Sequence, residues 1–330
     1  MQKKKITAAL WGLQLALLTG CGQAQAAPEE KNLQTRKTEN VAVDKAETPE
    51  IQETGAEMQI QESENSMETQ ETENTETDFP ETLHFVDAWG EWHDCVIDPE
   101  VLKHSYDWER LGREGEQVTY EGDSRFTLRY GVDVSKYQGT INWESVKAAG
   151  IDFAMVRIGY RGYGTAGTLK ADDYYARNLE EAKKAGIDVG VYFFSQAVNE
   201  TEAEEEAEFV IGLLDGYEIQ LPVVYDPELI RDDVARTDEV TGEQFTANTI
   251  AFCEKIKEAG YQPMIYSNMV WESELFDLKQ LEDYPIWYAD YEPVPQTPYH
   301  FQMWQYTEKG TVDGITGIVD RNVWFVPVEE

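Results

Sequence analysis

Two carboxylates directly follow an apolar stretch in the segment "LPVVYDPE", which covers residues 221–228. Val223–Tyr225 is typical of a buried strand, and Asp226 and Glu228 come next with only Pro227 between them. Because side chains at positions i and i+2 of a strand share a face, the two like charges are predicted to lie together. Crowding raises the pKa of one carboxyl, which then stays protonated near neutral pH while its neighbour is ionised. The pair therefore suits general acid catalysis.

Further acids follow other apolar segments of the chain. Asp133 lies in "GVDVSKYQG", Asp290 in "IWYADY" and Asp320 in "GIVDRNVW". In a barrel of parallel strands, groups at the carboxyl ends of the strands meet at one face, so these acids are expected to join Asp226 and Glu228 there. Glycoside hydrolysis needs one protonated acid for the leaving oxygen and a second carboxylate that stabilises positive charge at the sugar. The acids predict that chemistry, and aromatic residues at the same strand ends suit stacking on sugar rings.

Other chemistries find little support in the sequence. Only four histidines occur, and they are scattered: His84, His93, His104 and His300. This argues against a Ser–His–Asp or Cys–His site and against a metal site, so we expect no metal and no cofactor. The formal net charge of −37 argues against nucleic acid as a partner, because phosphate binding needs clustered Lys and Arg.

A repeated pattern predicts the elements that position these acids. The segments "VKAAGIDFAMVRIGY", "AKKAGIDVGVYFFS" and "IKEAGYQPMIYS" each join a Lys-bearing helix end to Ala-Gly and then to an apolar strand. Strands that are apolar on both faces are typical of parallel sheets covered by helices. Eight strands are predicted, near residues 129–135, 152–159, 188–195, 222–228, 262–267, 285–291, 300–306 and 317–325. Helices are plain in the first five gaps and thin or absent among the last three, so the predicted fold is α/β, an irregular and incomplete (β/α) barrel over 130–330.

The residues before the barrel divide into three predicted parts. Residues 1–20 form a signal peptide, because a basic start and a short apolar run lead into "LLTGC", which resembles a bacterial lipoprotein signal. Such a signal implies a lipid on Cys21 and a place on the outer face of the bacterial cell membrane; an ordinary secretory signal cut near residues 26–27 is the alternative. Residues 21–80, rich in Glu, Thr and Gln, are expected to be a disordered acidic linker. Residues 81–129 are expected to form a small β-rich appendage.

Two smaller features are left open by the sequence. Cys95 and Cys253 are able to pair outside the cell, but their spacing does not establish it. Cys253 is expected to be a small buried residue on the apolar face of a helix. Trp89 and Trp92 in "WGEW" are expected to pack against the barrel, with glycan binding as the alternative.

Residues 130–326 resemble the glycoside hydrolase family 25 lysozymes, the muramidases of the Chalaropsis type. The segments "GVDVSKYQGTINW", "LPVVYDPE", "AGYQPMIYSN" and "FQMWQYTEKGTVDGITGIVDRNVW" carry the resemblance. It implies cleavage of the β-1,4 bond between N-acetylmuramic acid and N-acetylglucosamine of peptidoglycan, and we expect the protein to be a monomer. It makes Glu228 the general acid and Asp226 a partner that positions either the substrate's acetamido group or a water, while Asp133 and Asp320 hold this pair and the substrate. The candidates for substrate binding are Gln138, Arg157, Tyr192, Tyr266, Trp287, Asp290, Gln305 and Tyr306.

The sequence departs from the family pattern at two places. Many members carry Lys-x-Ser/Thr-Glu at the end of the second strand, where this chain has Arg157-Ile158-Gly159-Tyr160. Pro227 removes a backbone donor and is expected to end its strand early and re-aim Glu228. Residues i and i+2 of a strand are about 6.6 Å apart, which does not choose between a retaining and an inverting reaction. Cleavage of another glycan linkage and a non-catalytic glycan-binding wall lipoprotein remain as alternatives.

Overall fold

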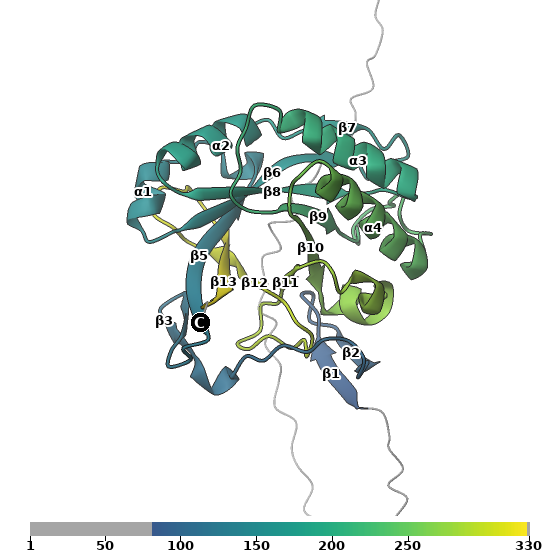
Figure 1. The fold of residues 1–330 in the computed structure, drawn as a ribbon, viewed down its shortest axis with the longest axis horizontal. Helices are drawn as coiled ribbons and strands as arrows, with labels where there is room; N and C mark the ends of the chain where they lie inside the picture. The colour runs from purple at the N-terminus through teal and green to yellow at the C-terminus, as the bar shows by residue number, and fades with distance from the viewer. Residues whose placement is uncertain (1–80, 329–330) are drawn as a thin grey trace, which may run out of the picture. The chain divides into compact units, whose positions relative to one another are not determined.

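The computed structural model describes residues 81–328 (Figure 1). The expectations for the signal peptide, for the lipid on Cys21 and for the acidic linker fall on residues 1–80 and so lie outside the described residues. No helix in the described part of the chain combines the length and the apolar character needed to cross a membrane.

Eight strands close into a ring in the order β5-β13-β12-β11-β10-β9-β8-β6, and β6 pairs back with β5. Neighbouring strands run parallel except at β13, which is antiparallel to both β12 and β5. The predicted barrel was expected to be incomplete, but the β5–β6 ladder closes it. A short strand, β7 (Leu169–Ala171), adds antiparallel to the end of β6. The strands of the ring are β5 (Phe126–Val134), β6 (Phe153–Arg161), β8 (Asp188–Ser195), β9 (Val223–Pro227), β10 (Pro263–Asn268), β11 (Ile286–Ala289), β12 (Met303–Gly310) and β13 (Val319–Pro327).

Helices follow the first four strands of the ring along the chain. They are α1 (Trp143–Ala148), α2 (Tyr175–Lys184), α3 (Glu200–Leu213) and α4 (Gly242–Glu258). Figure 1 shows α2 and α3 lying along β6 and β8, with α4 beside β9 and β10. A π-helical turn, η3 (Trp271–Leu275), and a 3-10 turn, η4 (Leu278–Leu281), replace a helix between β10 and β11.

The predicted helix ends are confirmed by the backbone. Gly150, Gly186 and Gly260, which follow α1, α2 and α4 in the three repeated segments, all have positive φ angles, of 89°, 76° and 87°. Glycine takes this left-handed conformation without the clash that a Cβ would cause, so it stops each helix and turns the chain into the next strand.

Successive side chains of each strand point to opposite faces, so the ring has two separate buried layers. One fills the lumen of the ring with Phe153, Met155, Leu221, Val224, Met264, Trp287 and Met303. The other, larger layer lies on the outer surface of the strands, where it meets the helices, and Tyr288 and Trp304 belong to it. Gly131 faces the lumen directly against the ring of Phe153, so a Cβ there would overlap that ring. Along each strand, every second residue therefore points into the lumen, and the residues between them point away from it. We call these two sets of positions the lumen-facing and the outward parity.

The residues before β5 form two separate hairpins. The first pairs β1 (Thr82–Val86) with β2 (Trp92–Val96), and its Phe85 packs on Met269 and Val270, just beyond the end of β10. The second pairs β3 (Leu111–Glu114) with β4 (Gln117–Tyr120), and its turn lies near the end of β12, where Glu116 accepts hydrogen bonds from Thr311. Both hairpins thus reach the face of the ring where the parallel strands end.

Three smaller expectations are settled by burial and pairing. The expectation that Trp92 packs against the barrel is wrong, because this side chain is 64% exposed and stacks on His84 of its own hairpin, whereas Trp89 is 47% exposed and contacts the barrel domain at Arg231. Cys253 is buried in α4, as predicted, and both Cys95 and Cys253 are free thiols.

Candidate active site

Asp226 and Glu228 stand where β9 ends. Asp226 is buried on the lumen-facing side of the strand, and β9 ends at Pro227, so Glu228 already belongs to the following turn. The amide of Gln196, just past the end of β8, donates to the Glu228 carbonyl at 2.7 Å. Thr237 donates its hydroxyl proton to the Gln196 amide oxygen at 3.0 Å. The backbone of the candidate acid is therefore held by Gln196 from the loop after β8, and Gln196 is held in turn by Thr237 from the later part of the β9–α4 connection.

Asp133 and Asp320 face each other across the β5–β13 ladder. Sequence analysis placed Asp320 with residues at strand ends, but it is the second residue of β13. It reaches the same face as the other acids because β13 runs antiparallel, which brings the beginning of this strand to the rim where the parallel strands end. The prediction that the two acids meet is confirmed, although the expected reason was wrong.

A network of amides and aromatic side chains holds the Asp133 carboxylate. Gln305 and Asn322 each donate a side-chain N–H to its Oδ2 atom, both at 2.9 Å. Tyr266 and Tyr291 donate to the Gln305 oxygen at 3.0 and 2.9 Å, and Trp287 donates its indole N–H to the Asn322 oxygen at 2.9 Å. Each amide is thus fixed in the orientation that presents its donors to Asp133.

Burial changes the proton affinity of the β9 pair. It raises the pKa of Asp226 well above its ordinary value, and the charges of Glu228 and Asp133 add to the rise, which Arg157 opposes. Loss of hydration raises the pKa of Glu228 to about 7, against the charge of Arg157 and with a contribution from Asp133. The Glu228 side chain is nevertheless exposed. Surrounding protein atoms displace much of its hydration without covering it, so the group keeps a raised pKa and an open approach.

The second pair of acids shares a proton. Burial raises the pKa of Asp320 well above its ordinary value, and so do the charge of Asp133 and the hydrogen bond to it. Burial also raises the pKa of Asp133, but hydrogen bonds from Asn322, Gln305 and Asp320 oppose that rise because they stabilise its ionised form. The hydrogen bond between the two groups therefore favours the ionised form of Asp133 and the neutral form of Asp320.

Arg157 is the cation among these acids. Its Nε and Nη2 atoms donate to Asp172 Oδ2 at 2.9 and 2.8 Å, and its guanidinium lies 5.1 and 5.4 Å from the ring centres of Tyr137 and Tyr160. Asp172 is buried and also accepts backbone N–H groups from residues 136 and 174. It holds the arginine so that one positive charge stands near several carboxyl groups.

Most of the predicted residues lie at the alternate strand positions that face the lumen of the ring. Tyr192 and Tyr266 pack edge-on against Trp287 at centre distances of 6.0 and 5.0 Å, beneath the carboxyl groups. The structure thus brings together the following predicted residues: Asp133, Arg157, Tyr192, Asp226, Glu228, Tyr266, Trp287, Gln305 and Asp320. Sequence analysis missed Gln196, Asp172, Tyr291 and Asn322. Only Asn322 carried a readable signal, because it lies two residues from Asp320 on the same face of β13.

Three predicted binding residues stand apart from this group. Asp290 shares the outward parity of Tyr288, and its oxygens accept from the Tyr288 hydroxyl and from Glu292 and Gln296. Tyr306 is buried on the outer surface of β12, near Arg113 and Arg321. Gln138 caps the short 3-10 helix η2 (Lys136–Gln138), where its amide oxygen accepts from the Ser135 backbone at 2.9 Å.

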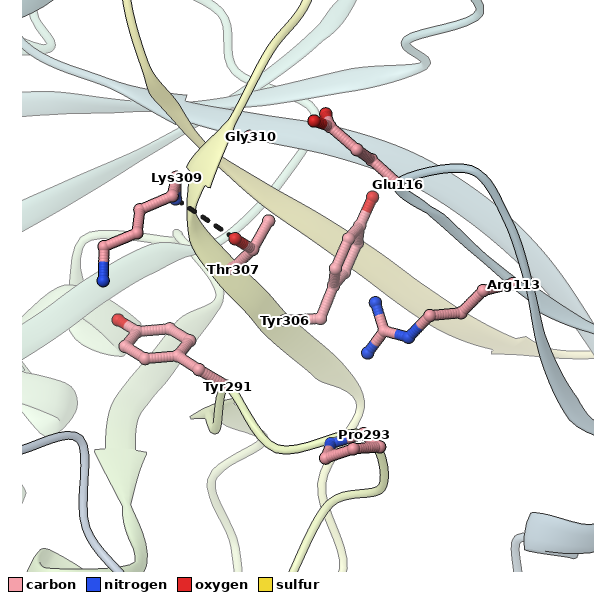
Figure 2. A pocket seen from close by; sticks show the side chains of 8 residues that line it. All are labelled: Arg113, Glu116, Tyr291, Pro293, Tyr306, Thr307, Lys309 and Gly310. Carbon is pink, nitrogen blue, oxygen red and sulfur yellow. Dashed lines mark hydrogen bonds between the residues drawn. The ribbon is translucent and has the colours of Figure 1, made fainter. Parts of the chain in front are cut away.

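A surface pocket of about 290 Å³ adjoins this site (Figure 2). Its walls come from the β3–β4 hairpin, from the end of β12 and from the segment after β11. Tyr291 connects the pocket with the carboxyl groups, because its ring lines the pocket while its hydroxyl donates to Gln305. The lining residues are Arg113, Glu116, Tyr291, Pro293, Tyr306, Thr307, Lys309 and Gly310.

The arrangement provides what acid-catalysed cleavage of a glycosidic bond requires. Four carboxyl groups around one arginine cannot all ionise near neutral pH, so the site retains protons. Glu228 is the most exposed of the four, so it is the member most open to a substrate. Of the aromatic rings below the carboxyl groups, Tyr192 and Tyr266 are half-buried and suited to stacking on a sugar, and Trp287 is buried behind them.

Comparisons with known proteins agree with this chemistry. Residues 132–315 match glycosyl hydrolases family 25. The chain is 28% identical over 211 residues to the uncharacterized protein YegX of Escherichia coli (strain K12), which covers 61% of this chain and 71% of that protein. It is 29% identical over 201 residues to Lysozyme M1 of Streptomyces globisporus, covering 58% of this chain and 66% of the lysozyme.

Solved structures show the same relationship. The structure of the modular autolysin LytC from Streptococcus pneumoniae, in complex with a synthetic peptidoglycan ligand, is similar with a TM-score of 0.54 and 26% identity. The similarity covers 73% of this chain and 56% of LytC, so the chain spans just over half the length of that autolysin. The family match includes Asp133, Asp226 and Glu228 and covers more than half of the residues, and the chain therefore belongs to glycosyl hydrolases family 25 and is a glycoside hydrolase.

Proposed function

We propose that this protein is a muramidase, which hydrolyses the β-1,4 bond between N-acetylmuramic acid and N-acetylglucosamine in peptidoglycan. The observation that carries the proposal is Glu228, an exposed carboxyl group with a pKa of about 7 at the end of β9, next to the buried Asp226. Two relatives are named as lysozymes, Lysozyme M1 and the autolytic lysozyme of Clostridium acetobutylicum, and both names support this choice of substrate.

Each acid has a distinct role in the proposed reaction. Glu228 donates its proton to the glycosidic oxygen as the bond to the sugar breaks. Asp226 positions the acetamido group of the substrate, or a water, against the sugar carbon where positive charge develops. Asp133, held by Gln305 and Asn322, and the protonated Asp320 support this pair and orient the sugar. Tyr192, Tyr266 and Trp287 supply the floor of the site.

The proposal also places the protein at the wall. The basic start and the "LLTGC" segment support export, with a lipid on Cys21 that anchors the chain to the outer face of the cell membrane. The acidic segment 21–80 would then act as a tether of on the order of 45 Å between the anchor and the barrel. Replacing Cys21 by Ser is expected to release the protein from membranes into the medium. Fractionation followed by immunoblotting measures this, and membrane retention of the variant would contradict a lipid anchor.

The direct test of the activity uses the purified protein and insoluble peptidoglycan. Released fragments are reduced with borohydride, and the reduced sugar is identified by mass spectrometry. We expect reduced muramic acid from the native protein, none from Glu228→Gln, and native yields from the matched control Glu258→Gln, an exposed residue at the end of α4. Reduced glucosamine would move the cut to the other linkage of the glycan. Binding without release would favour a non-catalytic glycan-binding protein.

A further inference from the structure

The pocket beside the active site holds a cation that the proposed mechanism does not use. Figure 2 shows Arg113 reaching from the β3–β4 hairpin toward Tyr306, with Lys309 on the other side of the opening. The guanidinium of Arg113 lies 5.8 and 5.7 Å from the ring centres of Trp304 and Tyr306. These rings hold the arginine in place by cation–π contact without using its N–H donors.

The two other charged groups of the pocket, Glu116 and Lys309, already have partners. Glu116 accepts from the backbone and hydroxyl of Thr311, both at 3.1 Å, and Lys309 pairs with Glu308 at 2.8 Å. By contrast, the Arg113 side chain makes no ion pair or hydrogen bond among residues 81–328, while its backbone stands opposite Val118 in the β3–β4 ladder. In a chain with a net charge of −37, an exposed arginine with all its donors available indicates a site for an anion from outside the protein.

A planar guanidinium binds carboxylates through paired N–H donors. The glycan of the proposed substrate is neutral along its sugars, and carboxylates occur on the peptide stems that its muramic acid residues carry. The pocket adjoins the carboxyl groups of the active site through Tyr291, so a stem next to the bond being cleaved lies within its reach. Arg113 and Glu116 precede residue 132, where the family match begins, so the N-terminal hairpin adds this pocket to the family's barrel.

We infer that the pocket between the β3–β4 hairpin and the end of β12 binds a carboxylate of the peptide stem through Arg113, so that the enzyme distinguishes walls by their stems. This inference rests on the proposed muramidase function. It gives the hairpin a role in selecting substrate, separate from the chemistry at Glu228.

The test combines a change in the enzyme with a change in the peptidoglycan substrate. Peptidoglycan is used either native or with its stem carboxylates converted to amides. Hydrolysis at low substrate, which reports kcat/KM, is measured for the native protein, Arg113→Ala, Arg113→Lys and the control Arg177→Ala, an exposed arginine on α2 paired with Glu181. Amidation also weakens the general repulsion between an acidic protein and the wall. The quantity compared across variants is therefore the ratio of kcat/KM on native wall to kcat/KM on amidated wall.

We expect Arg113→Ala to lower kcat/KM about fivefold on native wall relative to amidated wall, with Arg177→Ala unchanged. Arg113→Lys should fall between them, because it keeps the charge and loses the planar pair of donors. An equal loss on both walls, or no loss, would overturn the inference.

Binding separates this inference from the proposed function. Co-sedimentation with the two walls measures affinity without cleavage. If the native protein cleaves neither wall, the muramidase proposal fails, and a carboxylate-dependent loss of binding in Arg113→Ala still supports the pocket. If binding is the same for both walls and both proteins, the pocket assignment fails whatever the activity.

Discussion

At the residue scale, the site combines one exposed acid with three shielded ones. Glu228 sits outside its strand, within reach of solvent, whereas Asp133 and Asp226 are buried and Asp320 is half-buried. The two buried groups are covered by protein atoms in the free protein, and the charge of Asp133 contributes to the raised pKa of Glu228. This division explains how neighbouring carboxyl groups take different roles.

The raised pKa of Glu228 predicts the pH dependence of hydrolysis. The acid must be protonated to donate, and its pKa of about 7 means that the active form is lost as pH rises through neutrality. We expect kcat to fall about tenfold for each pH unit above 7, and a pH profile of reducing-end release from peptidoglycan measures this. A rate that rises between pH 7 and pH 9 would contradict the role of Glu228 as the acid.

Asn322 is predicted to matter for both stability and turnover. Replacing it by Ala leaves the Trp287 indole N–H and one lone pair of Asp133 without their partner, since Asn322 joins the two. We expect a loss of about 1–3 kcal/mol in the free energy of unfolding, measured by urea titration, and a lower kcat. The exposed Asn199→Ala, which removes only the cap of α3, provides a comparison that should leave kcat unchanged. Native kcat in Asn322→Ala would show that Asp133 needs no such support.

At the element scale, the β1–β2 hairpin holds the loop that follows the catalytic acid. Arg231, three residues after Glu228, donates to Glu91 at 2.8 Å and to Asp87 at 3.2 Å, and its guanidinium lies 3.8 Å from the ring centre of Trp89. The exposed Trp89 thus contacts the barrel domain by covering an arginine of the active-site loop, a partner that sequence analysis did not foresee.

Releasing this contact is predicted to affect turnover more than stability. We expect Arg231→Ala to lower kcat on the order of tenfold, because a loosened loop misplaces Glu228. The pair with Glu91 is exposed and contributes little, and Asp87, although its side chain is buried, keeps its hydrogen bonds from the backbone of residues 89 and 91, so thermal unfolding should change little. Kinetics and calorimetry together measure this, with Arg177→Ala as the matched control. Unchanged kcat would show that Gln196 and Thr237 position Glu228 without help from the hairpin.

At the scale of the whole molecule, buried acids make stability depend on pH. Burial raises the pKa of Glu272 to about 8, above its ordinary value of 4.5, and the pKa values of Asp133, Asp226 and Asp320 are raised as well. A carboxyl group with a raised folded pKa contributes stability at low pH, and this contribution is lost as pH rises through the folded value.

We therefore expect a higher melting temperature at pH 5.5 than at pH 8. Repulsion within a chain of net charge −37 acts in the same direction, because protonation reduces that charge. Differential scanning calorimetry across this range measures the effect, and Glu272→Gln should reduce the difference because it removes one titrating group and can still accept from Thr297. Equal melting temperatures at the two pH values, or a higher one at pH 8, would be incompatible with these raised pKa values.

Local sequence determined most of the strands and the helix ends. Apolar runs predicted the eight strands of the ring to within a few residues, and the Ala-Gly pairs marked three helix ends, because hydrophobic alternation and glycine's left-handed backbone act over a few residues. The acids at Asp133, Asp226 and Glu228 were likewise predictable, since they directly follow apolar runs. Side chains alternate between the two faces of a strand. Asp290 and Tyr306 each lie an odd number of residues after a lumen-facing residue, Trp287 and Gln305, so the sequence also predicts that they point away from the lumen.

Only the tertiary structure decided how the remaining parts meet. Strand direction is not encoded within a strand, so the antiparallel β13 that sets Asp320 opposite Asp133 appeared only in the closed ring. Gln305 and Asn322 converge on Asp133 from two other strands. The two hairpins bring Trp89 to the loop after β9 and Arg113 to β12, each more than 140 residues away along the chain. Such contacts depend on register and packing between distant segments, and local sequence pattern carries no record of them.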